Sequence, residues 1–254
     1  MEFSEEQLQR YSRQIVLPEI GGVGQERLLK ARVLVIGAGG LGSPALLYLA
    51  AAGIGTLGVV DDDSVDLSNL QRQILHDGAS LGRLKTESAL ARLRALNPGI
   101  VLRGHACRLT AANVRELVEG YDLVADGSDN FATRLLVHDA CRALGRSLVS
   151  ASVQGFSGQL TTFKAHMGAP HPCFHCLHPE APAPDALPSC AQGGVLGAAA
   201  GVMGTLQAVE VVKELLGFEA DSLSGTLLLY DALGARLDRL RLPRAERCAL
   251  EHAP

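Results

Sequence analysis

One glycine-rich run has the residue types and spacing to bind a phosphate compound. Gly37-x-Gly39-x-x-Gly42 follows an apolar stretch and precedes a helical one, and Asp61 ends the next apolar stretch. Glycines at this spacing let the backbone approach a phosphate at a helix N-terminus, and an acidic residue after the second strand suits a ribose. This pattern fits NAD or FAD as well as other nucleotides.

Charged and polar residues downstream favour ATP over a dinucleotide. A triphosphate carries about twice the phosphate charge, so it needs side-chain cations and usually Mg²⁺. The segment 64–73 supplies Arg72, and Lys85 is one of only four lysines among 23 basic residues. The segment 125–130, ADGSDN, offers oxygen ligands for Mg²⁺ on Asp126, Asp129 and Asn130.

Each of these groups also has a simpler interpretation. Arg72 or Lys85 alone would be a solvated surface charge, and Asp61 fits NAD enzymes equally well. The Ser-Asp-Asn sequence could be only an N-cap of the following helix. Their occurrence in order, each after a predicted strand, favours the ATP site.

The six cysteines suggest metal or thiol chemistry, because structural disulfides are rare in the cytosol. Cys173 and Cys176 have zinc-ligand spacing, although a lone CxxC could also be a redox pair. Its proline-rich surroundings favour the metal. Cys190 could be a small buried apolar residue or a nucleophile.

The elements that must position these residues alternate between strands and helices. After an amphipathic helix at 4–17, periodicity predicts strands at 32–37, 57–61, 100–106, 122–126 and 147–153. It predicts helices at 42–52, 82–96, 110–119 and 130–144. This order predicts an α/β, Rossmann-like, mainly parallel sheet with ligands at the carboxyl ends of the strands.

The pattern changes in the C-terminal part, where antiparallel strands are predicted to extend the sheet. They lie at 158–165 and in a hairpin of 226–231 and 235–242. Residues 169–190 hold six of the eleven prolines, which predicts a long loop without a regular element. Residues 194–217 read as a tightly packed buried helix.

Composition excludes several classes of protein. The net charge of −4 argues against general nucleic-acid binding, which needs a basic surface. The acidic, polar N-terminus has no signal core, and the helix at 194–217 carries too many charges to span a membrane. We therefore expect a cytoplasmic protein.

Six motifs resemble the MoeB/ThiF family, the bacterial relatives of ubiquitin-activating enzymes. They are RYSRQ, GAGGLGS, DDDSVDLSNLQRQ, GRLKTES, DGSDN and CFHC, and the resemblance runs from residue 10 to about 242. It implies a homodimer that uses ATP and Mg²⁺ to adenylate the C-terminal glycine of a ubiquitin-like sulfur carrier. Such carriers, of the MoaD/ThiS type, end in Gly-Gly and serve molybdopterin, thiamine or tRNA-thiolation pathways.

The resemblance also implies roles for individual residues. It makes Arg13 a phosphate contact, from the same chain or from the partner subunit, and Asp129 the Mg²⁺ ligand. The residues it implies for catalysis are Arg13, Arg72, Lys85, Asp129 and Cys190. The residues it implies around ATP are Gly39, Gly40, Gly42, Asp61, Asp63, Ser68, Asn69, Leu70, Gln71, Arg72, Lys85, Asp129 and Asn130.

The zinc site departs from the family pattern, in which a second CxxC near the C-terminus completes four cysteines. Here only Cys248 stands in that region, and His252 follows at C-x-x-x-H spacing. We expect zinc on Cys173, Cys176, Cys248 and His252, with Glu251 as the alternative fourth ligand.

The whole chain, 1–254, is expected to form one domain. Helices at 4–30 precede a nucleotide-binding part at about 31–155 and a part at about 156–254 for the carrier and zinc. Because no rhodanese-like segment follows residue 254, the sulfur donor is expected to be a separate cysteine desulfurase or rhodanese. Three alternatives remain: the branch of the family that modifies a tRNA adenosine, an NAD- or FAD-dependent oxidoreductase, and a binding module that has kept the fold but lost turnover.

Overall fold

A mixed sheet organises the computed structural model of the chain, which describes residues 3–179, 193–246 and 248. Within these residues the sheet has eight strands in the order β3-β2-β1-β4-β5-β6-β7-β8. The strands are β1 (Arg32–Ile36), β2 (Thr56–Val60), β3 (Val101–His105), β4 (Leu123–Asp126), β5 (Ser147–Gln154), β6 (Ser157–Phe163), β7 (Thr226–Asp231) and β8 (Arg236–Arg241). The first five strands are parallel and the last three are antiparallel additions, which confirms the predicted fold class.

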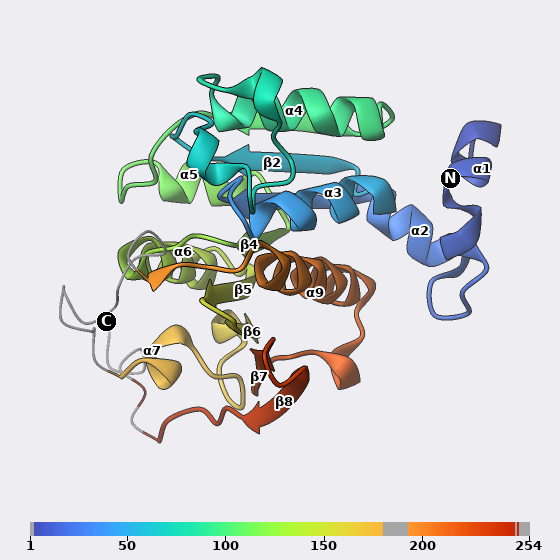
Figure 1. Cartoon of the computed structure of the whole chain (residues 1–254). Helices are drawn as coiled ribbons and strands as arrows, with labels where there is room; N and C mark the ends of the chain where they lie inside the picture. Colours follow the sequence, from blue (N-terminus) through green and yellow to red (C-terminus); the bar gives the residue numbers. More distant parts are fainter. Residues whose placement is uncertain (1–2, 180–192, 247, 249–254) are drawn as a thin grey trace.

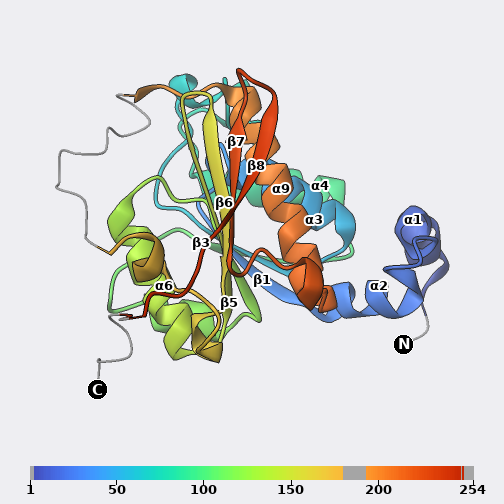
Figure 2. The ribbon, with the colours of Figure 1, turned by 90° about the horizontal axis from the view of Figure 1, so that it is seen from below.

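Helices cover both faces of the sheet (Figures 1 and 2). The helices α3 (Gly42–Ala52), α4 (Lys85–Leu96) and α9 (Gly197–Leu216) pack on one face, around a core that includes Leu46 and Met203. The helices α5 (Val114–Glu119), α6 (Phe131–Ala143) and α7 (Phe174–Leu177) lie against the other. The N-terminal helices α1 (Glu5–Ile15) and α2 (Gly21–Lys30) extend beyond the layer formed by α3, α4 and α9.

Local signals explain where several helices begin and end. A capping box starts α1, because the Ser4 hydroxyl accepts from the Gln7 amide while the Gln7 side chain accepts from the Ser4 amide. Gly53 ends α3 and Gly217 ends α9, both in the left-handed conformation that glycine tolerates.

The predicted buried helix at 194–217 corresponds to α9, and its glycines allow it to lie very close to α3. A Cβ added at Gly204 would overlap the backbone oxygen of Leu41, and one at Gly197 would overlap that of Gln71. In the described part of the chain, no helix combines the length and apolar character needed to cross a membrane.

Several predicted boundaries and one predicted loop differ from the structure. The helix predicted from residue 82 begins only at Lys85, and the one predicted from 110 begins at Val114. The prediction that 169–190 lacks any regular element is wrong, because α7 forms a single helical turn there. Pro172 and Pro179 flank this turn and limit it to four residues.

The close approach of α9 to α3 predicts opposite effects for two neighbouring glycines. We expect Gly204→Ala to destabilise the fold by about 1–3 kcal/mol, because the methyl group meets a backbone oxygen that cannot move aside. Gly201→Ala is the matched control, since nothing lies within 4 Å of its added Cβ. It should stabilise α9 by about 0.5–1 kcal/mol. Urea unfolding measures both, and equal free energies of unfolding for the two variants would contradict the described packing.

Candidate functional site

The glycine-rich turn follows β1 and leads into α3. Gly37 has φ +88°, a conformation that favours glycine, and its amide donates to the Val60 oxygen at 2.8 Å. A Cβ at Gly42 would overlap the carbonyl oxygen of Gly37. The spacing of these glycines therefore allows α3 to begin directly against the turn.

Asp61, which directly follows β2, holds this turn and lies close to Lys85. One oxygen of its carboxylate accepts from the Ala38 amide at 2.8 Å and the other from the Asp63 amide at 2.9 Å. Lys85 Nζ lies 2.8 Å from the Asp63 carboxylate and 3.9 Å from that of Asp61. Burial raises the pKa of Asp61, and the Lys85 ammonium opposes this effect. Lys85 thus forms a nearly enclosed cation, 7% exposed, at the start of α4.

The segment after β2 folds back over the glycine turn. A short 3-10 helix, Leu67–Asn69, is capped by Asp66, whose carboxylate accepts from the Ser68 amide and hydroxyl. The Arg72 guanidinium donates to the Ser68 oxygen at 3.0 Å, and its aliphatic carbons lie against Gly40. Asn69 and Leu70 are half-buried, and Ser68 and Gln71 are exposed.

The loop after β4 contributes a third set of side chains. Asp126 is fully buried, and its carboxylate accepts from the Ser128 amide at 2.9 Å. Burial raises the pKa of Asp126, with Arg134 acting in the opposite direction. Asp129 is exposed, whereas the Asn130 side chain accepts from the Thr133 amide and caps α6. The N-cap interpretation is therefore confirmed for Asn130, and Asp129 is the acidic side chain of this loop that reaches the surface.

The structure brings these segments together at the carboxyl ends of β1, β2 and β4. A Cβ at Gly37 would lie 3.4 Å from the Gly127 oxygen, and one at Gly40 would lie 3.3 Å from Ala200 of α9. The glycine turn thus contacts the loop after β4 on one side and α9 on the other. This edge is where an open α/β sheet binds its ligand.

Arg13 does not join this site within one chain. The Tyr11 ring packs on Gly53, which ends α3, and its hydroxyl accepts from the Asn97 side chain at 2.9 Å. The glycine turn lies at the opposite end of α3, about 16 Å away for eleven residues. The exposed Arg13 therefore lies on α1, near the C-terminal end of α3 and away from the glycine turn.

Three cysteines meet where α7 approaches the end of the described chain. Their sulfur atoms lie 3.3 Å (Cys173–Cys248), 3.6 Å (Cys173–Cys176) and 3.8 Å (Cys176–Cys248) apart. Tetrahedral zinc with bonds of 2.3 Å places thiolates about 3.8 Å apart, so the three sulfurs fit a zinc ion. Burial would raise the pKa of Cys176, but hydrogen bonds from the Cys173 and Ala245 backbones outweigh it and lower that pKa. Cys190, Glu251 and His252 lie outside the described residues.

A second acidic group lies beside the glycine turn. The carboxylates of Asp61, Asp62 and Asp63 come within 4.8 Å of one another, but two of the three are exposed. Exposed acidic groups of this kind are common without an ion, and Lys85 already contacts Asp63.

Two further residues of this edge were not predicted from the sequence. His76 is buried with its ring against the glycine turn, and Arg134 donates from α6 to the oxygens of Ser128 and Ala151. Neither belongs to the glycine pattern or to the metal spacing. The available signals were a histidine three residues after the polar segment 68–73 and an arginine in the first turn of α6.

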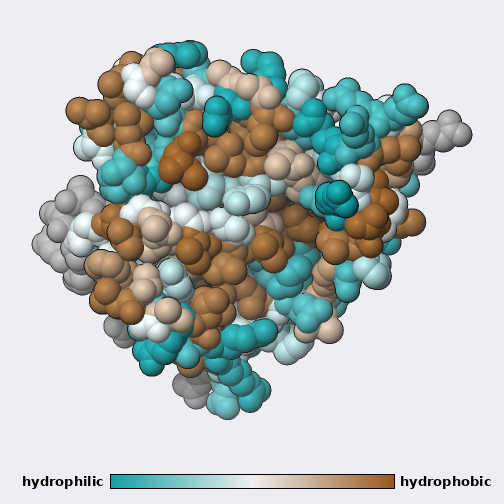
Figure 3. All heavy atoms as spheres, turned by 45° about the vertical axis from the view of Figure 1, so that its right-hand side comes forward, coloured by the Kyte–Doolittle hydropathy of each residue, from teal (hydrophilic) through white to brown (hydrophobic). Residues whose placement is uncertain are grey.

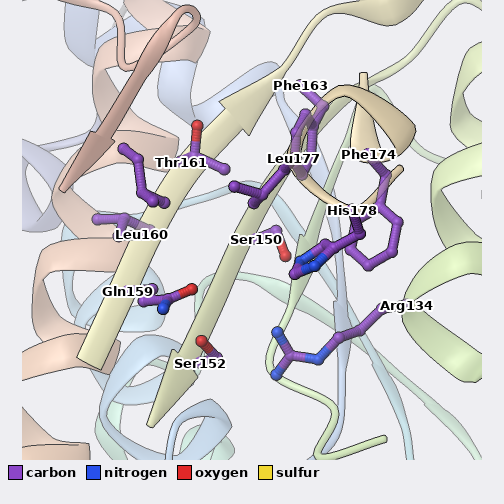
Figure 4. Close-up of a pocket in the computed structure, with 11 residues that line it drawn as sticks. Arg134, Ser150, Ser152, Gln159, Leu160, Thr161, Phe163, Phe174, Leu177 and His178 are labelled. Atoms are coloured by element: carbon purple, nitrogen blue, oxygen red, sulfur yellow. The ribbon is translucent and has the colours of Figure 1, made fainter. Parts of the chain in front are cut away.

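Arg134 also borders a small pocket between β5, β6 and α7 (Figure 4). The side chains of Ser150, Ser152 and Gln159 line it from the strands, and His178 faces Arg134 across it. Arg134 connects this pocket with the nucleotide edge, because its guanidinium also donates to the Ser128 backbone oxygen in the loop after β4.

Comparisons with known proteins agree with this geometry. Residues 11–250 match the model of the ThiF family. A sulfur carrier protein adenylyltransferase of Thermus thermophilus is 48% identical over 250 residues, which cover 98% of this chain and 92% of that protein. A SAMP-activating enzyme E1 of Haloferax volcanii is 50% identical over 227 residues, 89% of this chain and 82% of that protein.

Other relatives are longer or more distant. The adenylyltransferase and sulfurtransferase MOCS3 of Bos taurus is 52% identical over 253 residues, 99% of this chain but 55% of that protein. The chain thus spans about half the length of this relative. The crystal structure of E. coli MccB superposes with a TM-score of 0.83 at 19% identity, over 100% of this chain and 74% of that one, and it supports the fold alone. The family model matches most of the chain, and these relatives share about half of its residues. The chain therefore belongs to the ThiF family.

Proposed function

We propose that the chain is an adenylyltransferase that uses ATP to activate the C-terminal glycine of a ubiquitin-like sulfur-carrier protein. One observation carries the proposal: the glycine turn, Arg72, Lys85 and the exposed Asp129 converge at one edge of the sheet. The Thermus relative is a sulfur carrier protein adenylyltransferase, and the Bos relative is an adenylyltransferase and sulfurtransferase. In this proposal residues 31–155 bind the nucleotide and 156–254 bind the carrier.

The proposed reaction needs alignment and charge neutralisation rather than a general base. An α-carboxylate has a pKa of about 3.5, so the attacking group is already ionised at neutral pH. It attacks the α-phosphorus of ATP, and pyrophosphate leaves. Arg72 and Lys85 would neutralise the phosphate charge, and the amides of the glycine turn would orient the phosphates.

Asp129 would hold Mg²⁺, because its carboxylate is a hard oxygen ligand exposed beside the glycine turn. The ion would supply further charge neutralisation when bound. Asp61 would bind the ribose, since each oxygen of its carboxylate keeps a lone pair beyond its one backbone bond. The remaining predicted ATP contacts, from Gly39 to Asn130, keep the roles that the family resemblance implies.

The exchange of ATP and pyrophosphate driven by a carrier tests this site. We expect Arg72→Ala, Lys85→Ala and Asp129→Ala each to lower the exchange rate about 100-fold or more, because each removes charge stabilisation near the phosphates. Arg83→Ala is the matched control, because Arg83 lies two residues before Lys85. Its side chain is exposed and makes only a long ion pair, 4.0 Å, with Glu87, so the substitution should leave the exchange rate nearly unchanged.

Near-wild-type exchange in the Arg72 and Asp129 variants would contradict the assignment. Preferential binding of NAD(H) or FAD over ATP by the wild-type chain would instead support an oxidoreductase. A panel of purified carriers in the same assay identifies the preferred one.

We further propose that the enzyme is a homodimer in which Arg13 reaches the site of the partner subunit. Two observations support this. Arg13 lies at the far end of α3 from its own glycine turn. The face formed by α3 and α9 exposes Tyr48, Val202 and Val209, and Figure 3 shows apolar patches over this side of the molecule. A second copy would cover such a surface.

Complementation between inactive variants tests the shared site. Arg13→Ala and Asp129→Ala should each be inactive alone. After the two proteins are unfolded and refolded together, about a quarter of wild-type exchange activity should return, because half of the dimers contain one intact site. Refolding each variant alone is the control. No gain over these controls, with a dimer confirmed by light scattering, would show that Arg13 does not act across the interface.

The cluster of three cysteines supports a proposed structural zinc site. Cys173, Cys176 and Cys248 would hold the ion with His252 as the predicted fourth ligand. Such an ion would tie the end of the chain to α7 and would take no part in the adenylation step.

Metal analysis of freshly purified protein should find about one zinc per chain. Cys248→Ser should lower the zinc content and the melting temperature, whereas Cys107→Ser, outside the cluster, should leave the zinc content unchanged. His252→Ala should reduce zinc affinity in competition with a chelator, and Glu251→Ala should not. Well under one zinc per wild-type chain would argue against the site, and the reverse order of these two variants would make Glu251 the ligand.

A further inference from the structure

His76 is a buried histidine that the proposed reaction does not use. Its side chain is enclosed between the glycine turn and α4, with the residue 6% exposed. The Nε2 atom lies 2.9 Å from the carbonyl oxygen of Ala38, and Nδ1 lies 2.9 Å from the hydroxyl of Ser88. The ring therefore joins the turn after β1 to the helix that begins at Lys85.

These two partners determine where the proton of the ring lies. A carbonyl oxygen can only accept, so Nε2 carries the proton and donates it to Ala38. Nδ1 then accepts from the Ser88 hydroxyl. Burial lowers the pKa of His76, and the nearby Lys85 ammonium lowers it further, whereas the bond to Ala38 and the charges of Asp61 and Asp77 oppose this. The imidazole is therefore neutral near pH 7.

The bond to Ala38 completes a clamp on the glycine turn. The Ala38 amide donates to Asp61 at 2.8 Å, and the Ala38 carbonyl accepts from His76. The two peptide planes on either side of this residue are thus held by different side chains. In a trans peptide the C=O and the following N–H point in opposite directions, so holding the Ala38 oxygen on His76 turns the Gly39 N–H the other way.

The hydrogen bond between His76 and Ser88 connects the glycine turn to the helix that carries Lys85. Ser88 lies three residues after Lys85 on α4, so the two side chains share one face of the helix. A displacement of the helix relative to the turn would stretch the bonds that His76 makes to Ser88 and Ala38.

We infer that His76 is a positioning residue. Its imidazole fixes the Ala38–Gly39 peptide and connects it to α4, so that the Gly39 N–H and the Lys85 ammonium can bind the same nucleotide phosphates. This role rests on the proposed function. It predicts a defect in nucleotide binding and none in binding of the carrier.

Four variants of the full chain test this role. His76→Phe keeps a ring but loses both hydrogen bonds, and His76→Gln keeps an N–H donor for Ala38. Ser88→Ala removes only the hydroxyl. His105→Phe is the matched control, since the half-buried His105 is also hydrogen-bonded, but its ring contacts Tyr121, at 2.8 Å from the hydroxyl, and not the glycine turn.

Calorimetry with Mg²⁺ and adenosine 5′-(α,β-methylene)triphosphate measures nucleotide affinity, and the exchange assay measures the KM values for ATP and carrier. We expect His76→Phe to weaken nucleotide binding and raise the KM for ATP about tenfold, with the carrier KM unchanged. Ser88→Ala should show about a threefold effect, and His76→Gln should recover most of the loss. His105→Phe should match the wild type.

Wild-type nucleotide affinity in folded His76→Phe would overturn this role, and so would equal changes in the two KM values. If His76→Phe does not fold, wild-type nucleotide affinity in Ser88→Ala, together with an unchanged Gly39 amide exchange rate in that variant, would overturn it. A wild-type chain that binds no ATP would overturn the proposed function and this role together, whereas ATP binding with unaffected variants would overturn the role alone.

Discussion

The nucleotide edge of this protein depends on how closely α3 begins against the turn after β1. Gly42 leaves no room for a Cβ between the helix and the carbonyl oxygen of Gly37, and Gly37 itself has a positive φ. A side chain at position 42 would push α3 away from the turn. Ala38 would then lose its place between Asp61 and His76, because both bonds require the present path of the backbone.

Small residues on α9 extend the same constraint to a distant part of the chain. Gly197 lies against the backbone of Gln71, and Gly204 lies against that of Leu41. One helix therefore contacts both the segment that carries Arg72 and the start of α3. Larger side chains at these two positions would push α9 away from the backbone of Gln71 and Leu41. The close packing of this apolar helix therefore requires glycine at both positions.

On the opposite face, α6 links the nucleotide edge to the cysteine cluster. Asn130 caps its first turn, and Arg134 donates from that turn to the loop after β4. Further along the helix, His138 accepts from the Phe174 amide at 3.1 Å, next to Cys173. The two parts of the chain that hold the predicted catalytic and metal residues are thus attached to the same rigid element.

The order of strands and helices, the antiparallel extension and most of the nucleotide edge could be predicted from the sequence. Each depends on short-range patterns: apolar periodicity, glycine spacing, and polar residues placed directly after strands. The three cysteines could be grouped in the same way, because their residue type limits what they can do together. The helical turn at α7 could not, since prolines on both sides concealed a segment just long enough for one turn.

Only the tertiary structure separated residues of the same type by their surroundings. Asp126 and Asp129 stand in one short motif, yet the first is fully buried and the second is exposed, because the side chain of Asp126 is enclosed beneath α6. Arg13 and Arg72 both carry the expected charge, yet α1 places Arg13 at the far end of α3. His76 belongs to no spacing pattern, and its contacts with Ala38 and Ser88 exist only because the fold brings three segments together. The sequence by itself determined which groups this edge contains, since their chemistry belongs to the residue types; packing between distant segments decided which of them meet, because burial and contact distance are properties of the folded chain.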